Sequence, residues 1–160
     1  MIHRIAEAML TFGPLTTDKL QKLCYFAYAW YLTFYGERLF REKFEAGEQG
    51  PVCPELAKKY LEYGQGLIPK SDKKLGVIIN DEELKEYLIV LYDAYGCLNS
   101  EQLTELACSE EPWLNARERL AAGGSPVYRD EEIVNWNTRK ILRELSRENI
   151  CFVYSGQVRM

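Results

Sequence analysis

The thiols and the single imidazole are the groups of this sequence best suited to covalent chemistry. A cysteine nucleophile needs an oriented imidazole beside it, and the only histidine, His3, lies in the first turn of a predicted terminal helix. The cysteines are far apart and form no C-x-x-C pair: Cys24, Cys53, Cys97, Cys108 and Cys151. We therefore expect no metal site, and reduced thiols in a cytoplasmic protein. Catalysis through Cys24 or Cys108 is kept as an alternative.

Acidic pairs and glycines offer no better catalytic or cofactor site. Asp81-Glu82-Glu83 and Glu110-Glu111 fall at predicted helix starts, where acidic side chains interact favourably with the helix dipole. The stretch Gly64-x-Gly66 lacks the third glycine of a dinucleotide fingerprint, and the sequence has no lysine–hydroxyl phosphate loop. The sequence thus predicts a protein that is not an enzyme and binds no cofactor.

A basic stripe is the feature most compatible with nucleic-acid binding. Arg139, Arg143 and Arg147 recur every four residues, but Glu144 and Glu148 interleave with them. This mixture favours a solvated, ion-paired helix face over a DNA contact. The net charge of −4 and the isoelectric point near 5.2 also argue against nucleic acid as the partner, because phosphate binding depends on positive charge. A phage or mobile-element regulator that contacts DNA through this stripe is our second hypothesis.

An apolar segment rich in tyrosine predicts the centre of the molecule. Leu20–Tyr35 is apolar nearly all round, which is typical of a helix in the middle of a bundle. Thr16 or Thr17 is expected to cap this helix, and Gly36 to end it. The most apolar run, Leu23–Tyr35, is too short to span a membrane.

Three tyrosines of this helix form a stripe with two possible roles. Tyr28, Tyr31 and Tyr35 are placed on one face, in a chain that has 11 tyrosines. Buried in a core, their hydroxyls would bond to neighbouring backbone groups. Partly exposed, they would line a groove for a protein partner, since aromatic residues are enriched at binding hot spots. The sequence leaves both interpretations open.

The remaining elements predict a mainly α fold. A first helix is expected over Ile2–Phe12, and further helices are expected to begin at Pro54, Asn80, Asn99, Pro112 and Asp130. Extended segments or short strands are expected over Leu39–Glu48, Leu75–Ile79 and Ile150–Tyr154, with a turn at Gly50-Pro51 and a loop over Gln65–Lys74. We expect one compact domain, residues 1–160. It would be a helical bundle of about six or seven helices with a minor β-hairpin or small sheet.

One stretch resembles a known family. The run K19-L-Q-K-L-C-Y-F-A-Y-A-W30 is followed by Gly36, Leu39-Phe40, Glu42, Phe44-Glu45-Ala46 and Gly50-Pro51-Val52-x-Pro54-Glu55-Leu56. This pattern resembles the Panacea domain, also described as the phage-associated GepA-like or SocA-like antitoxin family. Later motifs are similar to the same family: Glu110-Glu111-Pro112-Trp113 with Ala116-Arg117, and Asp130-Glu131-Glu132-Ile133. Two residues depart from it, since Gly47 stands where an aromatic residue is common and Cys108 where many members have histidine.

The resemblance implies a helical, non-enzymatic protein encoded on phage, prophage or mobile elements. Such a protein binds and neutralises a cognate toxin, or acts as an adaptor that delivers the toxin to a AAA+ protease. Gly50-Pro51 would turn the chain so that the next helix docks on the central one, and Trp113 would pack as a large anchor. The residues we predict for protein binding are Tyr28, Tyr31, Tyr35, Glu48, Gln49, Gly50, Pro51 and Trp113.

Overall fold

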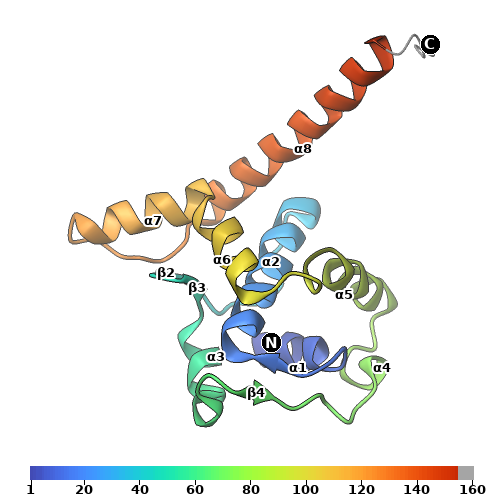
Figure 1. The fold of residues 1–160 in the computed structure, drawn as a ribbon, viewed down its shortest axis with the longest axis vertical. Helices are drawn as coiled ribbons and strands as arrows, with labels where there is room; N and C mark the ends of the chain where they lie inside the picture. The colour runs from blue at the N-terminus through green and yellow to red at the C-terminus, as the bar shows by residue number, and fades with distance from the viewer. Residues whose placement is uncertain (155–160) are drawn as a thin grey trace.

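The computed structural model describes residues 1–154, and of residues 148–154 only the backbone. Its elements in chain order are α1 (Ile2–Leu10), β1 (Leu15–Thr16), α2 (Thr17–Tyr35), β2 (Glu45–Gly47), β3 (Gly50–Val52), α3 (Pro54–Lys59), the 3₁₀ turn η1 (Leu61–Tyr63), β4 (Leu67–Ile68), α4 (Leu75–Ile78), α5 (Glu82–Tyr95), α6 (Ser100–Cys108), α7 (Glu111–Ala121) and α8 (Asp130–Tyr154). The described residues therefore confirm the mainly helical class with a minor sheet. Figure 1 shows α1, α5 and α6 beside α2, α7 projecting to one side, and α8 leaving the body as an arm.

Local sequence sets both ends of α2, as expected. The hydroxyl of Thr16 accepts a hydrogen bond from the Lys19 N–H at 3.2 Å, and Gly36 ends the helix with a left-handed φ of 70°. Residues 20–29 are all buried, because α1, α3, α5, α6, α8 and β3 pack around this helix. None of the helices within residues 1–154 is long and apolar enough to cross a membrane.

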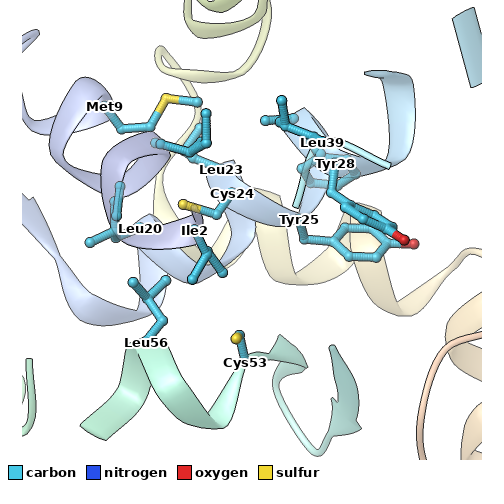
Figure 2. Packing of buried hydrophobic residues seen from close by; sticks show 14 of the residues in the cluster. Ile2, Met9, Leu20, Leu23, Cys24, Tyr25, Tyr28, Leu39, Cys53 and Leu56 are labelled. Atoms are coloured by element: carbon cyan, nitrogen blue, oxygen red, sulfur yellow. The ribbon is translucent and has the colours of Figure 1, made fainter. Parts of the chain in front are cut away.

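The core joins α2 to the N-terminal helix and to α3. Figure 2 shows Ile2, Leu20, Cys24 and Leu56 close together, and each of these side chains is fully buried. Burying one aliphatic side chain of this size stabilises the fold by about 2 kcal/mol. On another side of α2, the ring of Phe26 stacks on Tyr95 of α5 with 4.4 Å between centroids.

Two segments expected as strands are helical. The residues of Leu75–Ile79 form α4 up to Ile78, and this short helix packs on α1, where Arg4 donates a hydrogen bond to the Ile78 carbonyl at 2.9 Å. The backbone of Ile150–Tyr154 is helical and forms the end of α8. At the end of α8, each residue added to the existing helix gains one hydrogen bond, whereas a strand there would need a new pairing partner.

Two further expectations are corrected in detail. The loop expected over Gln65–Lys74 contains β4, which pairs antiparallel with β1 so that Ile68 lies opposite Leu15. Helix α5 is capped by Asp81 and not by Asn80, because the Asp81 carboxylate accepts the Leu84 N–H at 3.1 Å. The capping box expected at Asn99 and Gln102 is present at the start of α6.

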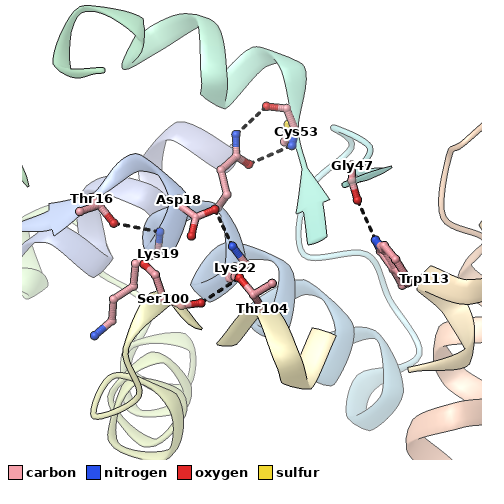
Figure 3. A network of polar contacts seen from close by, with 10 residues as sticks. Thr16, Asp18, Lys19, Lys22, Gly47, Cys53, Ser100, Thr104 and Trp113 are labelled. Atoms are coloured by element: carbon pink, nitrogen blue, oxygen red, sulfur yellow. Dashed lines mark hydrogen bonds and ion pairs between the residues drawn. The ribbon is translucent and has the colours of Figure 1, made fainter. Parts of the chain in front are cut away.

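A buried glutamine fixes the chain where it leaves the β-hairpin. The Gln21 side chain on α2 donates a hydrogen bond to the Cys53 carbonyl at 3.0 Å and accepts one from the Cys53 N–H at 2.9 Å. Figure 3 shows both bonds between α2 and the end of β3. Cys53 directly precedes Pro54, the first residue of α3. The side-chain amide of Gln21 therefore holds the junction between the hairpin and α3.

Replacing Gln21 with alanine should therefore destabilise the protein by about 2–4 kcal/mol. The substitution leaves two buried backbone groups of Cys53 without partners, and each costs about 1–3 kcal/mol. Urea unfolding followed by circular dichroism measures the change. Gln65→Ala, at an exposed position, should shift the free energy of unfolding by less than about 0.5 kcal/mol. Equal effects of the two substitutions would contradict the anchoring role of Gln21.

Candidate protein-binding site

The β2–β3 hairpin presents an exposed two-residue turn. Glu48 and Gln49 form this turn and are both exposed, whereas Gly50 and Pro51 are buried. The register places Gly47 opposite Gly50. The turn expected at Gly50-Pro51 thus lies two residues earlier, because these two residues belong to β3.

Gly50 lets the hairpin lie against a buried lysine. Its φ of 117° is rarely adopted by other residues, and a Cβ atom here would lie 3.2 Å from Cε of Lys22. The Lys22 side chain is 1% exposed, and its Nζ lies 2.5 Å from the Asp18 carboxylate, as Figure 3 shows. Gly50 and Pro51 therefore position the hairpin and are themselves inaccessible to a partner.

Trp113 and Arg117 hold the hairpin from α7. The indole N–H of Trp113 donates to the Gly47 carbonyl at 2.9 Å, a contact drawn in Figure 3, and Arg117 donates to the Ala46 carbonyl at 3.0 Å. The Arg117 guanidinium also lies 5.8 Å from the centre of the indole ring. Trp113 is half-buried, so it anchors the strand and still contributes to the surface beside it. Pro112 lies in the first turn of α7, as the sequence predicted.

The other edge of β2 pairs with the segment that leads into α8. The Ala46 N–H donates to the Pro126 carbonyl at 2.8 Å, and the Tyr128 N–H donates to the Phe44 carbonyl at 3.0 Å. Both edges of β2 are therefore paired with backbone of this chain. The turn Glu48-Gln49 is the part of the hairpin that projects from this paired region.

The structure divides the tyrosine stripe between core and surface. Tyr28 is buried, and its hydroxyl donates to the Asp130 carboxylate at 2.7 Å; burial and this carboxylate raise its pKa well above the usual value. Tyr31 is half-buried and Tyr35 exposed, and both rings contact Tyr87 of α5. Figure 1 shows α5 and the hairpin on different sides of α2, so these two tyrosines do not share a surface with the hairpin turn.

The cysteine thiols and the histidine lie in surroundings that are unfavourable for catalysis. Burial raises the pKa of the Cys53 thiol to about 11 and also raises the pKa values of Cys24 and Cys108. These thiols are therefore protonated at neutral pH, and catalysis through Cys24 or Cys108 gains no support. Burial also lowers the pKa of His3. Within the described residues, no three potential ligands among His, Cys, Asp and Glu are grouped as a metal site.

Ion pairs occupy much of the basic stripe on α8. Arg139 forms a salt bridge with Glu111 of α7, and Arg147 forms one with Glu144 at 3.1 Å. The Arg143 guanidinium lies 5.8 Å from the centre of the Trp136 ring. The ion-paired interpretation of this face therefore holds for Arg139 and Arg147.

Basic residues gather instead at a groove that the sequence analysis did not identify. The groove lies between the loop after α2, the end of α7 and the start of α8, and its basic residues are Arg38, Arg41, Lys43, Arg119 and Arg129. They come from three separate segments and share no helical period, so no local pattern marks them. The nearest signal is the spacing of Arg38, Arg41 and Lys43 in one loop.

Comparison with known proteins identifies the family. Residues 20–114 match the family described as antitoxin SocA-like, Panacea domain. No curated protein and no solved structure matches the chain. The matched region runs from α2 to the first residues of α7 and includes Gln21, the hairpin and Trp113. Because it covers more than half of the 160 residues, the chain belongs to the SocA-like antitoxin family with a Panacea domain.

Proposed function

We propose that this protein binds and neutralises a cognate protein toxin and does so without catalysis. The family match over residues 20–114 supports this proposal, since it names an antitoxin domain. The same region builds α2, the anchored hairpin and the helices beside them. We further propose that residues 1–160 act as one domain, in the cytoplasm, beside a toxin encoded in the neighbouring reading frame on a phage or mobile element.

We place the toxin contact at the hairpin turn and the adjacent face of α7. Of the residues predicted for protein binding, Glu48 and Gln49 are exposed here, and Trp113 is half-buried next to them. Leu114, which follows Trp113, is 43% exposed and adds apolar surface. A half-buried aromatic ring with exposed polar and apolar neighbours is typical of a protein-binding hot spot.

An adaptor role is a second mode of the same function. A direct inhibitor keeps its toxin in an inactive complex, whereas an adaptor passes the toxin to a AAA+ protease. The two modes differ in the fate of the toxin, so its cellular amount separates them. Binding to DNA through the α8 stripe gains no specific support, because Arg139 and Arg147 are already paired with carboxylates.

Co-expression with the protein encoded next to this chain tests the proposal. We expect the neighbour alone to stop bacterial growth and the two proteins together to restore it. Immunoblotting of the tagged neighbour then measures its amount: an unchanged level indicates direct inhibition, and depletion that requires a AAA+ protease indicates an adaptor. A harmless neighbour, or one that stays lethal in the presence of this protein, would contradict the proposed function.

Substituting the hairpin turn tests the contact surface. Glu48→Arg combined with Gln49→Arg should weaken binding of the purified toxin about tenfold or more, because both side chains are exposed at the centre of the proposed contact. Glu62→Arg with Gln65→Arg makes the same chemical change at exposed positions after α3 and serves as the control. Titration calorimetry gives the affinities. If both double variants bind like the unchanged protein, the contact does not lie at the hairpin turn.

A further inference from the structure

A basic groove of about 570 Å³ lies beside the hairpin, at the side opposite its turn. Its lining includes the five basic residues named above and two acidic ones, Asp130 and Glu131. This excess of positive charge is unusual in a chain whose net charge is −4. Val127 belongs to the groove and also pairs with Glu45 of β2, so the groove is continuous with the hairpin.

Two arginines of the groove are oriented by contacts within the protein. The Nε of Arg38 donates to the Asp130 carboxylate at 2.8 Å, and Arg119 donates to Glu132 at 2.7 Å and to the Val127 carbonyl at 3.0 Å. A guanidinium has five N–H donors in a planar fork. Arg119 is therefore held by two contacts, whereas Arg38 is held by one and is 58% exposed; both keep donors for a ligand.

Three other cations of the groove are not neutralised. Arg41, Lys43 and Arg129 are exposed, and none has an acidic partner within 4 Å among the residues whose side chains are described. The loop that carries Arg41 and Lys43 is anchored, because Phe40 and Phe44 on the same loop are buried against Tyr28. An ordered loop presents these charges with little loss of backbone entropy on binding.

We propose that this groove binds an acidic segment of the toxin through carboxylate side chains. The proposal rests on the proposed function, because it takes the toxin assigned there as the partner. The groove lies at the Glu45 end of the hairpin, away from the turn, so a second segment of the toxin would occupy it. Guanidinium forks match carboxylates geometrically, and two of them are already positioned. A short acidic segment fits within the groove. An extended nucleic-acid backbone fits less well, because it would continue into the next hollow, where three glutamates outnumber the two cations Arg41 and Lys43.

Charge reversal in the groove tests the inference on the full chain. Arg41→Glu combined with Arg129→Glu should weaken the affinity for the purified protein of the neighbouring reading frame by about tenfold or more, because like charges then face each other. Lys70→Glu with Lys74→Glu changes the net charge equally at exposed positions near β4 and should leave the affinity within about twofold. Affinities are measured by biolayer interferometry at low and at raised NaCl concentration, and thermal unfolding checks that each variant is folded.

The outcomes separate this inference from the proposed function. If the unchanged protein neither binds nor neutralises its neighbour, both fail. If the unchanged protein neutralises and the Arg41→Glu/Arg129→Glu variant binds as tightly, the toxin is bound but the groove does not take its acidic segment. Equal weakening by the groove variant and the Lys70→Glu/Lys74→Glu control would show an effect of net charge alone and would also overturn the inference. Selective weakening that shrinks as NaCl rises is the result we expect.

Discussion

The two hydrogen bonds between Gln21 and the Cys53 backbone are the constraint on which the placement of the β2–β3 hairpin depends. They join the central helix α2 to the residue between the hairpin and α3. Both atoms of the side-chain amide are used, so no shorter or charged residue can replace the pair of bonds. With Cys53 fixed, β3 must run beside α2, and β2 is placed between β3 and the segment before α8. The position of the exposed turn follows from this placement.

The buried lysine beside Gln21 further restricts how the hairpin packs on α2. An ammonium group that is 1% exposed is costly to desolvate, and Asp18 at 2.5 Å offsets part of that cost. Gly50 approaches the alkyl chain of Lys22 so closely that a Cβ atom would crowd it. Because the Lys22 ammonium pairs with Asp18 and its alkyl chain contacts the Gly50 backbone, few alternative packings of the hairpin are compatible with this site. Gln21 and Lys22 together therefore specify where the hairpin docks.

The parts of the fold that local sequence determines were predictable, and the parts that depend on distant segments were not. Helix caps at Thr16 and Asn99 follow from hydrogen bonds within three residues. The segment Leu75–Ile79 contains β-branched residues typical of a strand, but its packing on α1 favours a helix. The stripe Arg139–Arg147 is visible as a helical period, whereas the groove joins residues 38–43 to residues 119–131, so only the fold reveals it.

The positions that we propose to face a partner are largely separate from those that hold the fold; Trp113 and Arg119 are the exceptions, because both also make anchoring hydrogen bonds. Gln21, Lys22 and Gly50 are buried, and changing them carries a packing or hydrogen-bonding cost. Exposed side chains such as Glu48, Arg41 and Arg129 make no such contribution, so they are free to change with little effect on stability. Arg119 and Arg129 also lie outside the matched region 20–114, although they complete a groove that begins within it. If the exposed residues contact the toxin as proposed, one anchored framework can present different charges to different toxins, because the core does not need these residues.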